Sequence, residues 1–152
     1  MLRKSISFLL LLMLSQATIA TPQCESAVLQ TAVEKYFAFE INQDWHSLYN
    51  YRTSQFKAQI PEADYSEQLG AFVNEIWLAR FTWIGVEQDN DQCLVKVELS
   101  EGFLPGRERR FQRLGPNGNA FKQKVDMRWA ENNGSWVFVE STRVFQPFNS
   151  NE

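Results

Sequence analysis

The apolar residues change their spacing part-way along this chain, and that change limits the folds that it can adopt. Up to about residue 42 they recur at intervals of three and four residues, which is typical of one buried helix face. From about residue 79 they alternate with polar residues, which is typical of half-buried strands. Helices first and antiparallel strands afterwards predict the α+β class.

Three helices are expected in the first half of the chain. The longest covers 25–42, and Asp44 can cap a second, short helix after a polar break. After an irregular stretch that ends at Pro61, a third helix over about 62–75 carries an apolar side that includes Ile76. The apolar face of the first helix consists of Leu29, Ala32, Val33, Tyr36 and Phe37, with Glu40 at the end of the same series.

Four strands are expected in the second half, over 79–88, 93–100, 121–129 and 136–140. In the first of them, Trp83 is predicted on one face and Val86 on the other. The charged stretch from 102 to 119 contains Gly and Pro and predicts a loop, and residues 132–135 predict a hairpin turn. One buried sheet face against the first helix is expected to contain Cys93, Val95, Val97, Leu99, Phe121, Val125, Met127, Trp129, Trp136 and Phe138.

The first twenty residues have the pattern of a secretory signal peptide. Arg3 and Lys4 precede an apolar run over 6–14, and Thr18 and Ala20 place small side chains at a cleavage site. The alternative is a retained membrane anchor, but a spanning helix needs roughly 20 apolar residues. We therefore expect cleavage after Ala20 and export to the periplasm or the extracellular space.

Residues 21–152 are long enough for one domain with its own core. Without Arg3 and Lys4 they contain 13 Lys and Arg against 18 Asp and Glu, a net charge of −5. That sign argues against nucleic-acid binding, which requires positive charge to neutralise phosphates. No second long apolar stretch follows, so no stable membrane insertion is expected after cleavage.

Cys24 and Cys93 are the only cysteines, and an even pair in an exported protein predicts one disulfide bond. Metal binding is the competing hypothesis. Two cysteines and the single histidine, His46, do not form a tetrahedral zinc set at any usual spacing, so we expect no metal and no cofactor. Helical periodicity places His46 on the surface.

Two segments resemble the nuclear transport factor 2-like superfamily, which includes SnoaL-like and ketosteroid isomerase-like proteins. Residues 34–39 followed by 42–45 are similar to its long first helix, polar break and second helix beginning near an Asp. Residues 127–129 and 133–138 are similar to its last hairpin. The resemblance implies a cone, with N-terminal helices on the concave face of a curved antiparallel sheet and often a pocket at the open end. The resemblance to this superfamily also favours the bacterial periplasm as the location of the protein.

The resemblance places Tyr36 where the isomerase branch has a tyrosine that holds an oxyanion. That chemistry also needs a carboxylate base, and the matching region here, residues 50–56, contains no Asp or Glu. A core tyrosine is the alternative interpretation of Tyr36, and we favour it.

Two polar residues interrupt the apolar strand faces, and they suggest a small-ligand pocket. Gln123 follows Phe121, and Glu140 follows Phe138 in the same alternating series. An inward polar group must be hydrogen-bonded, lie near water or bind something. The predicted ligand-binding set is Tyr36, Trp83, Gln123, Trp129 and Glu140, and the alternative is that Gln123 and Glu140 lie at strand ends near water. If Glu140 faces inward, Arg143 or Arg128 is its expected partner.

The densest positive run is Arg107–Arg113, which Lys122, Lys124 and Arg128 could extend on the outward strand face. Anionic lipid head groups, acidic envelope polymers or an acidic protein would suit such a run. A solvated loop explains it equally simply.

Three functions therefore remain open. The leading hypothesis is an exported, non-catalytic domain that binds a small apolar or amphipathic ligand or a protein partner. The second is an isomerase-, dehydratase- or cyclase-type enzyme that uses Tyr36 with Gln123 or Glu140. The third is a structural interaction subunit that forms a homodimer.

Overall fold

Four helices precede four strands in the computed structural model, which describes residues 23–103, 120–144 and 146–148. The helices are α1 (Ala27–Ile41), α2 (Trp45–Asn50), α3 (Ser54–Gln59) and α4 (Glu62–Val73). The strands are β1 (Ile76–Asp89), β2 (Gln92–Phe103), β3 (Ala120–Asn132) and β4 (Ser135–Ser141). This order confirms the predicted α+β class.

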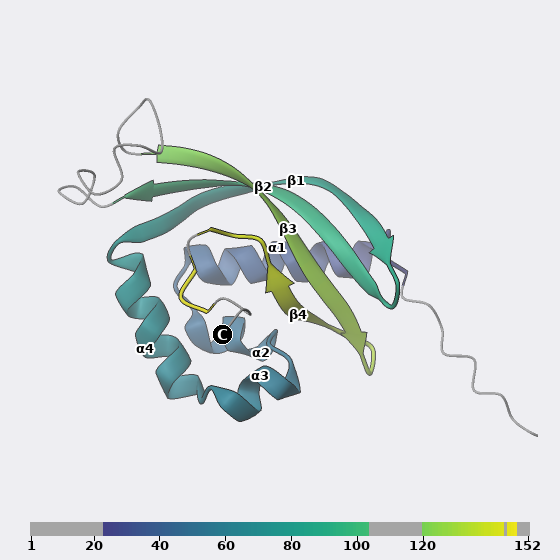
Figure 1. The fold of residues 1–152 in the computed structure, drawn as a ribbon, viewed down its shortest axis with the longest axis horizontal. Helices are drawn as coiled ribbons and strands as arrows, with labels where there is room; N and C mark the ends of the chain where they lie inside the picture. The colour runs from purple at the N-terminus through teal and green to yellow at the C-terminus, as the bar shows by residue number, and fades with distance from the viewer. Residues whose placement is uncertain (1–22, 104–119, 145, 149–152) are drawn as a thin grey trace, which may run out of the picture.

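The strands form one antiparallel sheet in the order β1-β2-β3-β4, so each strand pairs with its neighbour in sequence. The sheet is strongly curved and arches over α1, and α2, α3 and α4 lie on the same concave side (Figure 1). Asn133 and Gly134 both have positive φ and join β3 to β4 in a two-residue turn. The arrangement is the cone-like α+β fold that the resemblance implied.

The concave face of the sheet is apolar and is paired in register. Cys93, Val95 and Val97 of β2 lie opposite Trp129, Met127 and Val125 of β3. Nine of the ten residues predicted for this face are buried, and the tenth, Phe121, is half-buried. The lysines at 96, 122 and 124 lie on the outer face, so the predicted strand register is correct.

Two bulges in β1 change which of its side chains face the core. The pairing with β2 shifts between Leu78 and Arg80 and again between Trp83 and Gly85. After the second bulge, Val86 lies opposite Val95 and packs against the core. The prediction that Val86 faces away from the side of Trp83 is therefore wrong, because the extra residue of a bulge reverses the alternation.

Side-chain caps start three of the four helices, α1, α2 and α3, and α3 was not predicted from the sequence. The Ser26 and Asp44 side chains accept hydrogen bonds from the backbone N–H groups of Leu29 and Ser47, as expected for helix N-caps. The Thr53 hydroxyl accepts from the Phe56 N–H at 3.1 Å and starts α3, where the sequence predicted irregular chain. The third predicted helix, α4, ends at Val73, so Ile76 begins β1 instead of lying on the helix.

The predicted disulfide is present and ties the start of α1 to the second strand. Cys24 and Cys93 are bonded, with their Cα atoms 5.4 Å apart and 69 positions apart in sequence. Both residues are buried. A bond of this kind suits an oxidising compartment, as expected for an exported protein.

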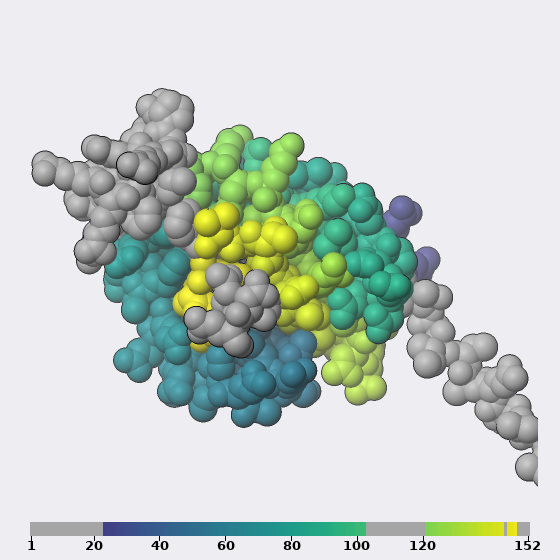
Figure 2. Space-filling model, viewed as in Figure 1, coloured from purple at the N-terminus to yellow at the C-terminus, as the bar shows by residue number. Residues whose placement is uncertain are grey.

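The end of the chain returns across the open side of the cone. The C-terminal segment, residues 142–144 and 146–148, follows β4 and lies between the sheet and the helices α2 to α4 (Figures 1 and 2). The Phe148 ring stacks on Tyr65 at 5.2 Å between centroids and contacts Phe56 edge-on. No helix within the described ranges has the length and apolarity needed to cross a membrane.

Candidate functional site

Tyr36 and Trp129, two residues of the predicted ligand set, lie in the packed interior of the cone. Their ring centroids are 5.5 Å apart in an edge-to-face arrangement, and Phe138 lies 5.2 Å from Tyr36. All three side chains are buried. Burial raises the pKa of the Tyr36 hydroxyl above its ordinary value, although the nearby Arg52 guanidinium partly opposes this shift.

Trp83 and Gln123 also face the concave side, but they occupy different parts of it. Trp83 is half-buried and lies opposite Val97 in the β1–β2 ladder. Gln123 lies opposite Leu99, donates a hydrogen bond to Glu101, and accepts one from the Val144 N–H at 3.1 Å. Both polar ends of the Gln123 amide are therefore used within the protein.

Glu140 does not share the face of Gln123, because the β3–β4 register shifts between Arg128 and Trp129. Phe138 lies opposite Trp129 on the inner side, but Glu140 lies opposite Arg128 on the outer side. Arg128 donates to Glu140 at 2.9 Å and also pairs with Asp89. Glu140 therefore lies on the outer face and not on the inner face that the alternation predicted, because a bulge precedes it. Its expected pairing with Arg128 is present.

The structure therefore divides the predicted ligand set. Tyr36 and Trp129 belong to the aromatic core, Gln123 is held by Glu101 and Val144, and Glu140 is on the opposite face. A ligand-binding role for these five residues remains a prediction. A different set of buried charges occupies the mouth of the cone.

The Arg143 cluster, as it is called here, consists of three charged residues, Arg143, Glu40 and Glu101, together with the neutral Gln123. Arg143 comes from the C-terminal segment and donates to Glu101 through Nε at 2.8 Å and through a second nitrogen. Its remaining amine nitrogen donates to Glu40 at 2.6 Å. The side chains of Arg143, Glu40 and Glu101 are 10%, 9% and 0% exposed.

The Arg143 cluster is nearly complete in its hydrogen bonds. Burial alone would lower the pKa of Arg143, but Glu40 and Glu101 together raise it above its ordinary value. Among the described residues, the buried side-chain atoms without a hydrogen-bond partner are Glu40 Oε2 and the Trp129 indole nitrogen. The carboxylates are thus engaged by an arginine and are poorly placed to act as a free general base.

A second buried cation, Arg52, lies beside this cluster. Its guanidinium is 4.6 Å from the Phe138 ring centroid, 4.7 Å from Phe56 and 5.2 Å from Tyr65. Its Nε also donates to the Tyr65 hydroxyl at 3.3 Å. Two arginines and two glutamates therefore balance one another within the cone.

Sequence reasoning placed Glu40 on the inner face of the first helix and named Arg143 only as a partner for Glu140, and it missed Glu101 and Arg52. Glu40 ends the apolar series of α1, and Glu101 stands two residues after Leu99 in the alternating series of β2, so both had a detectable signal. Arg52 had none, because it follows α2 in a short connection without periodicity.

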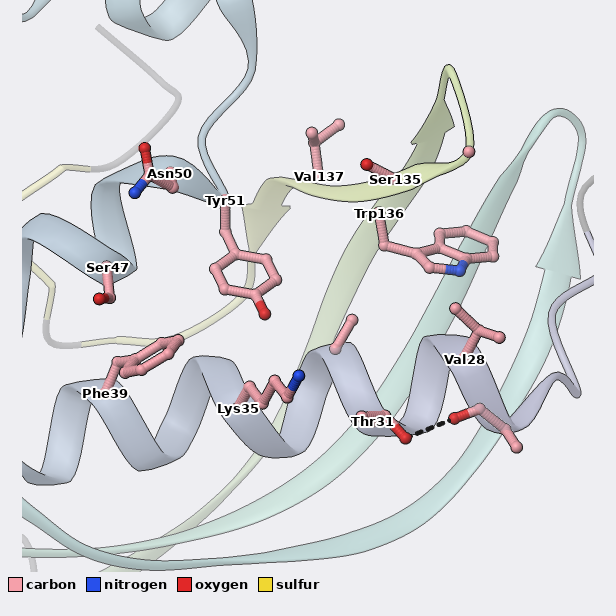
Figure 3. Close-up of a pocket in the computed structure, with 13 residues that line it drawn as sticks. Val28, Thr31, Lys35, Phe39, Ser47, Asn50, Tyr51, Ser135, Trp136 and Val137 are labelled. Atoms are coloured by element: carbon pink, nitrogen blue, oxygen red, sulfur yellow. Dashed lines mark hydrogen bonds between the residues drawn. The ribbon is translucent and has the colours of Figure 1, made fainter.

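An open groove lies outside the cone, between α1 and the edge strand β4. Its volume is about 660 Å³, within the roughly 300–1,000 Å³ range of small-ligand sites. Figure 3 shows Trp136 of β4 and Tyr51 pointing toward α1, from which Val28, Lys35 and Phe39 project. Its lining residues are Ala27, Val28, Thr31, Ala32, Lys35, Phe39, Ser47, Asn50, Tyr51, Gly134, Ser135, Trp136 and Val137.

Lys35 is the one charged residue among the described residues that line this α1–β4 groove. Within the described ranges, no carboxylate lies at ion-pair distance from its ammonium group. Val28, at the other end of the groove, is 64% exposed although it is apolar. The groove therefore offers apolar walls and one positive charge, a combination suited to an amphipathic anion.

A second cavity of about 840 Å³ lies between α3, the end of β4 and the C-terminal segment. Glu140 lines it together with Arg52, Gln59, Gln68 and Phe148. Several of its polar groups already bond within the protein, including Glu140 to Arg128 and Arg52 to Tyr65. Because these polar groups are already engaged, the second cavity is a weaker candidate for a ligand site than the α1–β4 groove.

The remaining predicted features have these positions. His46 is exposed on α2 and bonds to Glu62, as expected for a surface residue. In the part of the chain that the structure describes, no group of three or more His, Cys, Asp or Glu is arranged to hold a metal ion. The Arg107–Arg113 run and the predicted signal peptide, residues 1–20, lie outside the described residues.

Comparison with known proteins supports the fold. No protein-family model matches the chain, and no curated protein matches it. Among solved structures, it is similar to a SEC-C motif-containing protein from Rhodopseudomonas palustris, with a TM-score of 0.52 and 12% identity over 74% of this chain and 76% of that one. Aln2 from a Streptomyces species matches with a TM-score of 0.42 and 12% identity over 76% of this chain and 89% of that one. At this identity the first likeness concerns the fold alone.

Proposed function

We propose that this chain is an exported, non-catalytic binding domain of the nuclear transport factor 2-like superfamily. In this proposal an apolar or amphipathic ligand binds in the α1–β4 groove. The observation that carries it is the contrast between a filled cone and an open groove whose one cation, Lys35, has no ion-pair partner among the described residues.

The interior of the cone supports a non-catalytic role. An isomerase-type reaction needs a carboxylate that is free to take a proton and a donor that faces the substrate. Here Arg143 engages Glu40 and Glu101, and aromatic rings surround Tyr36. These groups stabilise one another, so we prefer binding to catalysis.

The groove supports the choice of ligand. Val28 on α1 lies near Trp136 of β4, and Phe39 lies near Tyr51 at the other end of the groove (Figure 3), so burial of an alkyl chain there would remove apolar surface from water. A carboxylate or similar acid at the other end of the ligand would pair with Lys35. The disulfide is consistent with an oxidising compartment such as the periplasm.

Decanoate is a direct test ligand, because it combines an alkyl chain with one carboxylate. We expect its titration into the full exported protein to shift the NMR signals of groove residues such as Val28, Lys35 and Trp136. Val28→Asp should weaken binding at least tenfold, since it adds a negative charge to an exposed apolar wall.

Ile84→Asp is the matched control, because Ile84 of β1 is also an apolar residue, 50% exposed, and does not line the groove. It should leave decanoate binding unchanged. Shifts confined to residues of the second cavity, or equal losses in both variants, would refute the groove as the site.

A further inference from the structure

We propose that the natural occupant of the α1–β4 groove is an extended peptide segment. It would pair with the edge of β4 at Trp136 and place an acidic side chain against Lys35. This inference rests on the proposed function, because it names the class of ligand for the same site.

The edge of β4 offers backbone groups to such a segment. β4 is the last strand of the sheet, so among the described residues one of its edges has no strand beside it. Phe138 donates its backbone N–H to Tyr51 O at 2.7 Å, so this N–H points away from β3. Hydrogen-bonding directions repeat every second residue of a strand, and the N–H and C=O of Trp136 therefore also point away from β3.

The protein already pairs a short piece of chain with this edge. Arg52 forms an isolated parallel bridge with Phe138, immediately beyond the groove. The pairing does not continue to Trp136, because the residues before Tyr51 belong to α2 (Trp45–Asn50) and are helical. Within the described ranges, no backbone hydrogen bond outside the β3–β4 ladder reaches Trp136. A peptide would extend a pairing that the fold itself begins.

The wall opposite this edge defines the side chains that the peptide needs. Alternate side chains of a paired strand would face α1, where Val28 and Ala32 are apolar and Lys35 is positive. A peptide with apolar and acidic residues two positions apart fits this surface. Backbone pairing provides affinity in such strand additions, while alternate side chains provide specificity.

The test uses an acetylated, amidated probe peptide of sequence Thr-Val-Thr-Glu-Thr-Val, which places its two valines and its glutamate on one face. Two further versions carry N-methyl groups on one or the other alternating set of amides. Only one set can face β4, so one version should bind about tenfold more weakly and the other should bind nearly as well as the parent.

Hydrogen exchange gives an internal control within β4. The parent peptide should slow exchange of the Trp136 amide. It should not change that of Val137, whose N–H points toward β3 by the same alternation. Replacing the peptide glutamate with glutamine should weaken binding a few-fold in the wild type and not in Lys35→Gln. Lys124→Gln, on the outer face of the sheet, should retain the wild-type preference.

The outcomes separate this inference from the proposed function. If decanoate binds in the groove but no peptide does, or if both N-methylated versions bind like the parent, strand pairing is refuted and the groove remains a ligand site. If neither decanoate nor the peptide binds, both proposals fail. Selective loss with one N-methylated version, together with slowed exchange at Trp136, would establish strand pairing.

Discussion

The mouth of the cone and the α1–β4 groove both contain aromatic and charged residues, yet they differ in how completely these residues are partnered. In the cone, Arg143 holds Glu40 and Glu101, and Arg52 lies among three rings. In the groove, Lys35 has no carboxylate at ion-pair distance among the described residues, and Val28 is largely exposed.

This difference separates groups that maintain the fold from groups that remain available to a ligand. A buried charge is costly unless it is paired, so the charges of the cone are expected to affect stability when they are changed. An exposed apolar wall and a solvated cation cost little and are available for binding. Buried polar residues alone would have pointed to the cone as the functional site.

The largest expected effect is that of Arg143→Ala. It would leave the Glu40 and Glu101 carboxylates buried without the arginine that hydrogen-bonds to both, and such a loss costs about 3–5 kcal/mol in the free energy of unfolding. Urea denaturation would measure it. The outer-face Arg128→Ala, whose partners Asp89 and Glu140 are partly exposed, should cost much less, because solvent screens an exposed ion pair.

A double variant would show whether charge causes this loss. Glu101→Gln combined with Arg143→Met removes one charge of each sign and leaves Glu40 to balance Arg52, so the variant should recover part of the stability lost in Arg143→Ala. Equal stability of Arg143→Ala and Arg128→Ala would show that the Arg143 cluster is not a structural element, which would reopen the cone as a candidate active site.

The disulfide should have the next largest effect. Replacing both Cys24 and Cys93 with Ala removes a cross-link that closes a 69-position separation, and we expect a loss of about 2–4 kcal/mol. Denaturation of the variant, compared with the oxidised wild type, would measure it. Cys24 precedes α1, and the first turns of α1 line the groove, so loss of the disulfide should also weaken ligand binding. Unchanged binding would show that packing alone holds α1 in place.

Groove substitutions should have small effects on stability. Val28→Ser and Lys35→Gln change an exposed wall and a charge without an ion-pair partner among the described residues, so each should alter the free energy of unfolding by no more than about 0.5 kcal/mol. Thermal and urea denaturation would measure this. Losses above about 2 kcal/mol would show that the groove is part of the structural core and would remove the distinction between the two regions.

The smallest expected effect concerns His46 on the surface of α2. Its hydrogen bond and charge interaction with Glu62 raise the pKa of the imidazole above its ordinary value of 6.5. The protonated form is therefore favoured in the folded state, so the contribution to stability is complete below pH about 6.5 and is lost as the pH rises through the folded-state pKa. An NMR titration should show a lower His46 pKa in Glu62→Gln; no change would exclude this pairing in solution.

Most of the sheet could be predicted from alternation, because a strand with one buried face places every second side chain inside. The series from Cys93 to Leu99 has this pattern, and its buried face lies where the sequence predicts. The prediction failed where a bulge interrupts pairing, at Val86 in β1 and at Glu140 in β4. A bulge depends on how two strands twist together, and neither strand alone contains that information.

The candidate site was much less predictable than the fold. The groove joins residues near 28–39 on α1 to residues 134–137 in the last turn and β4, two segments about one hundred positions apart in the chain. Nothing in the local sequence of Val28 or Lys35 distinguishes them from ordinary surface residues of an amphipathic helix. Their significance follows only from the strand edge that lies opposite them.

The sequence by itself determined the α+β class, the pairing of Cys24 with Cys93 and the inner face of the sheet. Each of these depends on local periodicity or on the count of one residue type. Only the tertiary structure decided that Arg143 pairs with both Glu40 and Glu101, and that the edge of β4 faces an open groove. Charge pairing and cavity shape depend on distances between remote segments, and these distances are fixed only when helices and sheet pack together.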